Sequence, residues 1–253
     1  MARPLRVQFP GASYHITSRG NDRMPIFADD QDRLKFLSLL REVTRRFGWS
    51  VSAWVLMTNH FHLVVTTPHP NLCKAMHWLN TSYVGYYNRR HKRKGHLIEG
   101  RFDGRLIDSS TYMAEVLRYT VLNPVRANMC VRPEDYAWSS YRATVGLEPA
   151  PDWLDIHAAL SWFGGESELG RANYQDAVAM IGCEDRLWDK LVNGIFLGSE
   201  EWALEMRKKV EEKPRSSEHP AKQRAIGRPK MAYIIEAIGQ VTGGTAEAIR
   251  AAH

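Results

Sequence analysis

Apolar and polar positions change their period several times along the first half of the chain, and each change marks an element. Ser13–Arg19 alternates and is rich in β-forming residues, which predicts a strand. Asp29–Phe47 has leucines near helical spacing, begins with acidic residues and is followed by Gly48, all of which are typical of a helix. Trp49–Met57 and His60–Thr67 are two β-rich runs separated by two residues, which predicts a hairpin.

The next segments predict a helix, a strand and a further helix. Asn71–Asn88 has helical character, and Arg105–Asp108 is a short β-rich run. A serine at position 109 or 110 can cap a helix to about Leu122, where Pro124 limits it. The order β-α-β-β-α-β fits a ferredoxin-like α+β sandwich, an antiparallel sheet with helices on one face, and the last helix is an addition.

The character of the chain changes after Gly146, and Pro149–Pro151 is the expected boundary. We expect a first domain over residues 1–146 and an acidic, mainly helical extension over residues 147–212. Residues 213–230 are basic and contain proline, which predicts a linker. Residues 231–253 predict a helix, a glycine-containing turn and a second helix, which is part of a helix-turn-helix.

Charge is spread unevenly along the chain, whose formal net charge is +6. Residues 1–146 hold 21 Lys and Arg against 11 Asp and Glu, whereas residues 147–212 hold 6 against 14. A basic N-terminal part is expected of a domain that binds a polyanion, although a basic domain without a nucleic-acid role has the same composition.

Composition also bounds the class of protein. The hydrophobic fraction of 44% is sufficient for a core, and no apolar run reaches the roughly 20 residues of a membrane span. The N-terminus has no apolar stretch after its basic residues, so we expect no signal peptide. Three scattered cysteines, Cys73, Cys130 and Cys183, favour a reducing, cytoplasmic location over a disulfide framework.

A His-x-His motif lies in the second strand of the predicted hairpin. Because side chains alternate along a strand, His60 and His62 share one face while Phe61 points to the other. Two imidazoles on one face of a rigid strand can chelate a divalent ion. Two polar residues on a solvent-exposed face would give the same pattern.

A tyrosine and an asparagine occupy one face of the helix that begins near residue 109. Tyr119 and Asn123 are four residues apart, and Glu115 is one turn earlier on the same stripe. A phenol one turn from a carboxamide oxygen can serve as a nucleophile beside a metal ligand. Alternatively, Tyr119 is a half-buried aromatic and Asn123 a residue at the end of the helix before Pro124.

Taken together, these motifs resemble the single-tyrosine HUH transposases, and in particular the REP-associated tyrosine transposases. The resemblance covers roughly residues 8–145, and it rests mainly on two motifs in this order and spacing. It is strongest in Asn-His-Phe-His-Leu at 59–63 and Leu-Arg-Tyr-Thr-Val-Leu-Asn-Pro-Val-Arg-Ala at 117–127. His15, Gly-Arg-Phe at 100–102, Tyr-Ala-Trp-Ser-Ser-Tyr at 136–141 and a segment at 194–202 are also similar.

The resemblance implies a role for each motif residue. It implies that His60 and His62 hold a divalent metal, that Asn123 is the third ligand, and that Tyr119 attacks a DNA phosphate. Two nitrogens and one oxygen suit Mg²⁺ or Mn²⁺ better than structural zinc. Asn123 departs from related enzymes, which often have Gln there, and the following proline disfavours helical geometry at it.

The expected activity is therefore metal-dependent cleavage and strand transfer on single-stranded or hairpin DNA through a 5′-phosphotyrosine, at hairpins or REP-type repeats. A non-catalytic protein that binds DNA repeats on the same fold is the main alternative. A metal hydrolase that uses water on a small phosphate ester is another, and it leaves the basic N-terminal part unexplained. The resemblance allows a monomer or a homodimer and implies no membrane partner.

A run of cations follows the second predicted helix and predicts contacts with a phosphate backbone. A solvated loop is the alternative interpretation of this run. Three tyrosines of that helix, at positions 83, 86 and 87, could stack on bases, but core packing is expected for at least two. The expected DNA-binding residues are Arg89, Arg90, Lys92, Arg93, Lys94, Arg101 and Arg105.

Overall fold

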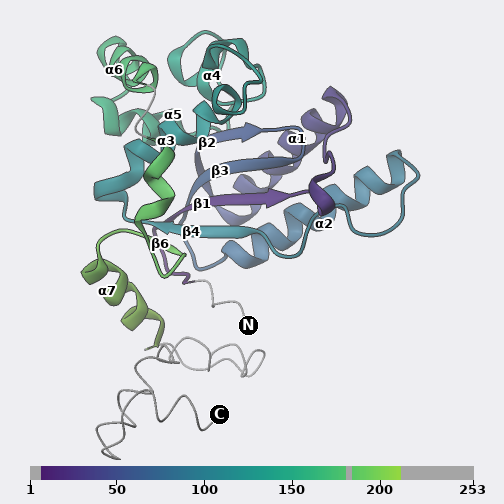
Figure 1. Cartoon of the computed structure of the whole chain (residues 1–253), viewed down its shortest axis with the longest axis horizontal. Coiled ribbons are helices and arrows are strands. Elements are labelled where there is room, and N and C mark those ends of the chain that lie inside the picture. Colours follow the sequence, from purple (N-terminus) through teal and green to yellow (C-terminus); the bar gives the residue numbers. More distant parts are fainter. Residues whose placement is uncertain (1–6, 181–183, 212–253) are drawn as a thin grey trace, which may run out of the picture. The chain divides into compact units, whose positions relative to one another are not determined.

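The computed structural model describes residues 7–180 and 184–211, and the predicted β-α-β-β-α-β-α order is present in it (Figure 1). The expected linker, the helix-turn-helix segment and Cys183 lie outside the described residues. The first seven main elements are β1 (Ala12–Arg19), α1 (Asp30–Phe47), β2 (Ser50–Leu56), β3 (His60–Thr67), α2 (Leu72–Arg90), β4 (Asp103–Ile107) and α3 (Ser109–Arg126).

The first four strands form the sheet of a ferredoxin-like fold. Their order is β2-β3-β1-β4, and every neighbouring pair among them is antiparallel. Hydrogen bonding between Met57 and His60 closes the β2–β3 hairpin over a two-residue turn, as the sequence predicts. The predicted α+β class with an antiparallel sheet is therefore confirmed.

Helix α1 has the ends that its sequence predicts. Asp29 precedes it in extended conformation, and its carboxylate accepts a hydrogen bond of 3.1 Å from the Asp32 backbone N–H. Gly48 follows it with a φ of +70°, which suits glycine because a Cβ disfavours the left-handed region. The chain can therefore reverse directly into β2.

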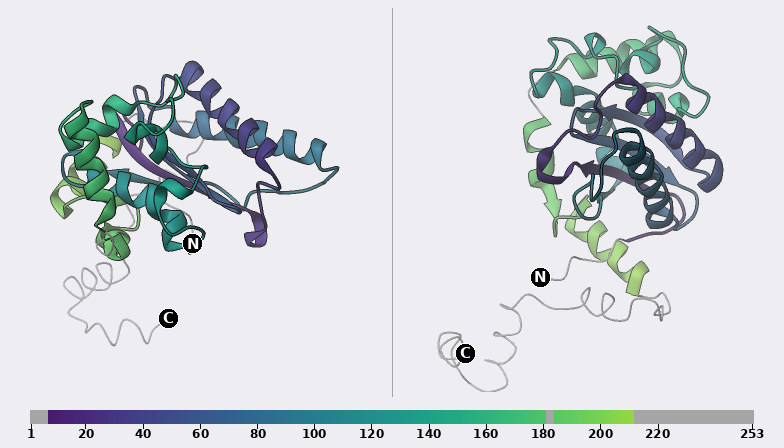
Figure 2. Two further views of the ribbon diagram at one scale, coloured as in Figure 1. Left: turned by 90° about the horizontal axis from the view of Figure 1, so that it is seen from above. Right: turned by 90° about the vertical axis from the view of Figure 1, so that its right-hand side faces the viewer.

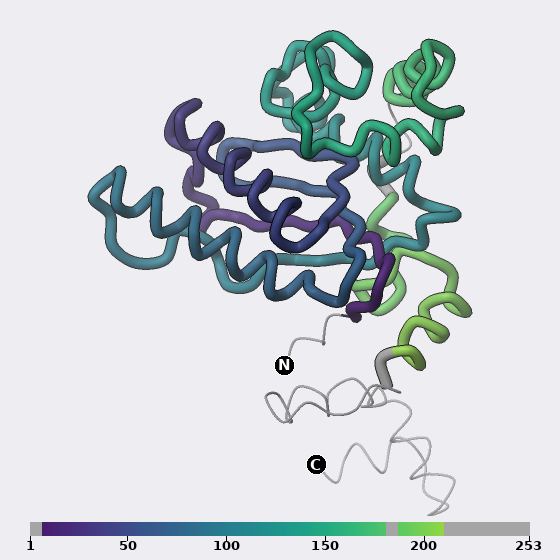
Figure 3. Tube along the Cα trace, turned by 180° about the vertical axis from the view of Figure 1, so that it is seen from behind, coloured from purple at the N-terminus to yellow at the C-terminus, as the bar shows by residue number. Residues whose placement is uncertain are grey.

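Helices α1 and α2 lie side by side over one face of the sheet, as the view from behind shows (Figure 3). Phe61 of β3 points to this face, and its ring centroid lies 4.5 Å from that of Phe36 in α1. Phe36 in turn contacts Tyr83 of α2 at 5.2 Å, and all three rings are fully buried. Tyr83 and Tyr87 are core residues, which confirms that at least two tyrosines of α2 pack inside.

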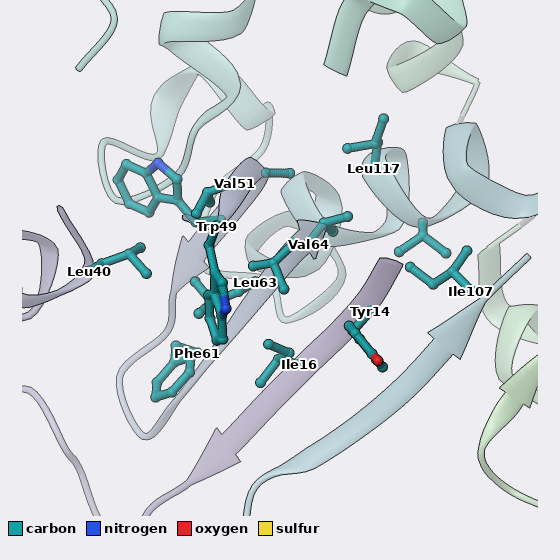
Figure 4. Packing of buried hydrophobic residues seen from close by; sticks show 14 of the residues in the cluster. Tyr14, Ile16, Leu40, Trp49, Val51, Phe61, Leu63, Val64, Ile107 and Leu117 are labelled. Carbon is teal, nitrogen blue, oxygen red and sulfur yellow. The ribbon is translucent and has the colours of Figure 1, made fainter. Parts of the chain in front are cut away.

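Apolar side chains of β1 and β3 pack between the sheet and these helices (Figure 4). Ile16, Phe61 and Leu63 are fully buried and alternate with the polar residues of the same strands. Burial of each such side chain contributes about 1.5–3 kcal/mol, so the alternation holds the strands in one register. The polar residues between them consequently face the other side.

Helix α3 covers part of that other side, and it does not end where the sequence predicts. Its first residue is Ser109, its N-cap is Asp108, and it continues through Pro124 to Arg126. The expected end near Leu122 and the serine cap are therefore wrong. The Asp108 carboxylate accepts hydrogen bonds from the hydroxyls of Ser110 and Thr111 instead of capping a backbone N–H.

The segment after residue 146 adds two strands that the sequence did not predict. Strand β6 pairs in parallel with β4, and β5 pairs with β6, so the sheet has six strands and the free edge of β4 is covered. The expectation of a mainly helical extension missed these strands because each has only two residues. The remaining elements are α4 (Tyr141–Val145), α5 (Ile156–Leu160), α6 (Glu168–Ala179), β5 (Leu191–Val192), β6 (Phe196–Leu197) and α7 (Glu200–Glu211), with short 3-10 helices between them.

The opposite edge of the sheet is covered as well. Backbone hydrogen bonds of 2.9 Å join β2 to Trp138, Ser140 and Asp155.

The two views of Figure 2 show the later helices and α3 gathered at one end of the sheet, with α1 and α2 extending away from it. Residues 7–210 accordingly form one compact unit, so residues 147–210 pack with the first four strands. Among the described residues, no helix is long and apolar enough to cross a membrane.

Candidate functional site

The pairing register places the two histidines of the His-x-His motif on the face opposite α1 and α2. Directly opposite residues of an antiparallel pair share a face, and Thr17 lies opposite His62 while Arg19 lies opposite His60. Phe61, between the histidines, points into the core on the other face. The strand alternation that the sequence predicts is therefore present, and β1 supplies the neighbours of both imidazoles.

His60 is held by the residue before it. Its Nδ1 lies 2.7 Å from Oδ1 of Asn59, and Nδ2 of Asn59 donates to the backbone carbonyl of Arg23 at 2.8 Å. Burial and, to a smaller extent, the positive charge of Arg19 lower the pKa of His60 from 6.5 to about 4. His60 is thus neutral at physiological pH, which is the form that binds metals.

His62 is buried, with 6% of its surface exposed. Its Nδ1 lies 3.1 Å from the Thr17 hydroxyl and 3.0 Å from Nε2 of His15. Its Nε2 is buried without a hydrogen-bond partner among the described residues. Burial, followed by the charges of neighbouring groups, holds the pKa of His62 well below its ordinary value of 6.5, so this ring is also neutral.

His15 of β1 contacts one residue of each motif, His62 and Tyr119. In the sequence, only the family resemblance indicated this residue. Its side chain is 2% exposed, and its ring stacks on His62 with centroids 5.0 Å apart. Burial lowers its pKa from 6.5 to about 3, with a smaller contribution from the charge of Arg105. A buried neutral imidazole therefore packs against His62 on the same face of the sheet.

Tyr119 of α3 lies edge-on to these rings. Its ring centroid is 5.8 Å from that of His15 and 6.1 Å from that of His62. Trp188, in the 3-10 helix Glu184–Lys190, contacts Tyr119 at 5.0 Å and His15 at 4.6 Å. The guanidinium of Arg126 lies 4.7 Å from the centre of the tyrosine ring. The fold thus brings Tyr119 to the histidines, although 57 residues separate it from His62.

Asn123 has a role within its own helix. Its Nδ2 donates to the carbonyls of Tyr119 at 2.8 Å and Thr120 at 3.3 Å. In a regular helix the Thr120 carbonyl would accept from the N–H of residue 124, which proline lacks. The amide therefore replaces the missing donor, which allows the helix to continue past Pro124. No hydrogen bond joins Asn123 to His60 or His62 in the described part of the chain.

The expected DNA-binding cations fall into two groups. Arg90 forms ion pairs of 2.6 Å with Asp29 and with the fully buried Asp32, so it ties the end of α2 to the start of α1. Arg105 pairs with Asp103 at 3.0 Å and lies over the Trp188 ring at 4.2 Å. The other side chains are exposed: Arg89, Lys92, Arg93, Lys94 and Arg101.

The residues present fit a two-histidine metal site. Both imidazoles are neutral, and the unpartnered buried Nε2 of His62 is the kind of atom that a metal ion satisfies. Among the described residues, no group of three or more His, Cys, Asp and Glu side chains converges as a metal site. A third ligand from the described residues would therefore have to be a side chain of another type, such as the carboxamide of Asn123.

The chain is similar to known proteins over its first half and in its fold. Residues 8–119 match the family described as "Transposase IS200 like". The chain is similar to a solved structure titled "Structure of the REP associates tyrosine transposase bound to a REP hairpin", with 20% identity and a TM-score of 0.50, over 66% of this chain and 98% of that chain. Another solved structure, tRNA(His) guanylyltransferase from Saccharomyces cerevisiae, has 9% identity and a TM-score of 0.36, over 72% of this chain and 84% of that chain. No curated protein matches the sequence.

The family match covers most of the site described above. It includes the ferredoxin-like strands, both histidines of the motif and, as its last residue, Tyr119. Asn123 lies just beyond it. Residues 8–119 are thus similar to the IS200-like transposase family, and the fold is similar to that of a REP-associated tyrosine transposase.

Proposed function

We propose that the protein is a metal-dependent endonuclease and strand transferase that acts on single-stranded DNA through a tyrosine nucleophile. The observation that carries the proposal is the position of the Tyr119 ring, 6.1 Å from the ring of His62 and above the face that holds both motif histidines. The class of reaction is inferred from the transposase family that residues 8–119 match. The solved relative is bound to a REP hairpin, which supports a hairpin or REP-type repeat as the substrate.

The covalent step conserves the phosphodiester. Tyr119 Oη attacks the phosphorus, its proton leaves to solvent, and the bond from phosphorus to the 3′-oxygen breaks. The 3′-oxygen takes a proton and departs as a free 3′-OH, while the 5′-phosphate remains on the tyrosine. A different 3′-OH can later attack this phosphotyrosine and release the phenol, so strands are joined without another energy source.

His60 and His62, with Asn123 as the third member, would hold Mg²⁺ or Mn²⁺ in this proposal. A bound divalent cation polarises a phosphoryl oxygen and offsets charge that develops during attack. The histidines serve this role because they are neutral and fixed by β3. Asn123 can contribute only Oδ1, since its Nδ2 is engaged by the helix.

Exposed cations supply the expected contacts with the DNA backbone. Arg89, Lys92, Arg93 and Lys94 lie at and after the end of α2, and Arg101 precedes β4. Phosphate contacts of this kind give affinity that falls with salt and carry little sequence information. Arg90 and Arg105 belong to the same proposal, although both already pair with carboxylates.

A substitution pair on one helix tests the nucleophile. Tyr119→Phe should abolish the covalent adduct on a labelled single-stranded hairpin while leaving binding intact. Tyr112→Phe removes a hydroxyl from the same helix two turns earlier and serves as the matched control. If the Tyr119→Phe protein still cleaves, or if only Tyr112→Phe loses the adduct, Tyr119 is not the nucleophile. His60→Ala should remove cleavage and most of its metal dependence.

A non-catalytic protein that binds DNA repeats is the second candidate function. It is favoured by the hydrogen bonds of Asn123, whose amide is engaged by its own helix. It is also favoured by the lack, among the described residues, of three or more His, Cys, Asp or Glu side chains that could hold a metal ion together. Metal-independent binding of hairpins without any adduct, in the presence of Mg²⁺ or Mn²⁺, would establish this alternative. The same experiment at several protein concentrations would distinguish a monomer from a homodimer.

A further inference from the structure

Asn59 occupies the second position of the β2–β3 turn, directly before the first histidine of the motif. Its backbone and side chain are both engaged, since the Gly20 N–H donates to its carbonyl at 2.8 Å and its own Nδ2 donates to the Arg23 carbonyl at 2.8 Å. Its Oδ1 lies 2.7 Å from Nδ1 of His60. The side chain therefore bridges the segment after β1 and the imidazole.

The two ends of the Asn59 amide are distinguishable by their partners. A backbone carbonyl only accepts hydrogen bonds, so the atom that faces Arg23 must be the NH₂ group. The atom that faces His60 is consequently the oxygen, which also only accepts. It follows that His60 carries a proton on Nδ1.

The protonation of one ring nitrogen decides the role of the other. A neutral imidazole has a single N–H, so a proton on Nδ1 leaves a lone pair on Nε2. The neutral ring is the form that binds a metal. In water the imidazole of histidine favours the opposite tautomer, with the proton on Nε2 and no lone pair there.

We infer that Asn59 is a positioning residue that holds His60 in the Nδ1–H tautomer and thereby presents Nε2 as a metal ligand. The inference rests on the proposed function for the identity of the ligand, while the tautomer itself is a property of the metal-free chain. Metal-binding histidines commonly donate their other N–H to an oxygen, which fixes the ring and raises its basicity. Asn59 gives His60 this partner from within the same turn.

The tautomer can be read directly from ¹⁵N-detected imidazole spectra of the full-length, metal-free protein at neutral pH. The wild type should show His60 protonated on Nδ1. Asn59→Leu should shift the population towards Nε2–H, because the acceptor is removed. Asn59→Asp keeps an acceptor oxygen and should retain the Nδ1–H form. Asn59→Ala provides the same comparison with a smaller side chain if the leucine variant fails to fold.

Titration with Mn²⁺ alone, followed by calorimetry, measures the consequence for binding. Loss of an outer partner of this kind weakens metal affinity by roughly 10–100-fold, which is the effect expected for Asn59→Leu. Asn88→Leu is the matched control, since Asn88 also donates to a loop carbonyl, that of Gly95 at 3.0 Å, and no hydrogen bond joins it to a histidine in the described part of the chain.

Each outcome has a defined meaning. An unchanged His60 tautomer in both Asn59→Leu and Asn59→Ala overturns the inference, as does a changed tautomer with unchanged Mn²⁺ affinity. A shift in the tautomer together with weaker Mn²⁺ binding supports it. If the wild type binds no Mn²⁺, the proposed metal site is wrong and the ligand role fails with it, whereas a wild-type Nε2–H tautomer would refute the assignment of Asn59 alone.

Discussion

Acid should destabilise the metal-free protein through the buried histidines, and His15 allows the effect to be isolated. The pKa of His15 is lowered from 6.5 to about 3 because its ring is desolvated in the fold. Between these values the unfolded chain binds a proton that the folded chain does not. The free energy of unfolding therefore rises with pH in this window, and stability is lost as the pH falls from 6.5 towards 3.

The size of the effect follows from the two pKa values. One pKa unit corresponds to about 1.4 kcal/mol, so acidification from about pH 7 to about pH 5 should cost about 2 kcal/mol through His15 alone. The pKa values of His60 and His62 are lowered in the same direction, so their contributions add to this loss. The total is a substantial part of the roughly 5–15 kcal/mol by which a typical domain is stable.

Urea denaturation of wild type and His15→Gln at both pH values, with a chelator present, tests this estimate. Glutamine places an acceptor near the position of Nε2 but does not titrate, so the variant should lose about 2 kcal/mol less than wild type on acidification. His77→Gln, at an exposed position of α2, controls for the chemical change itself. Equal losses in wild type and His15→Gln would refute the reasoning from burial.

Two further predictions concern residues that hold the fold together. Arg90→Ala should lower the thermal midpoint of unfolding, because it removes the ion pairs of α2 with two carboxylates at the start of α1. Arg89→Ala, at an exposed position, should leave the midpoint unchanged and reduce the salt slope of hairpin binding by about one. Equal midpoints of the two variants in calorimetry would contradict this prediction. Gly20→Ala would place a Cβ 2.0 Å from the Met24 carbonyl oxygen and should cost about 1–3 kcal/mol in urea denaturation. Gly85→Ala, which meets open space in α2, is its control, and comparable stability of the two variants would count against the tight fit.

The covering of the sheet edges illustrates a limit of local patterns. Strands β5 and β6 have two residues each, so they carry no detectable alternation, and only the pairing of β6 with β4 and of β5 with β6 makes them strands. The end of α3 shows a second limit. Pro124 predicts a helix end, but the amide of Asn123 supplies the donor that proline lacks, and such a side-chain substitute is visible only in three dimensions.

The sequence by itself determined the order of the first seven main elements and the shared face of His60 and His62. These features follow from periods of two and 3.6 residues, which are local properties of the backbone. The tertiary structure alone decided that His15 and Trp188 join Tyr119 beside those histidines, and that Arg90 is paired with buried Asp32. Such contacts join residues far apart in the chain, and they depend on strand register and helix packing rather than on any local pattern.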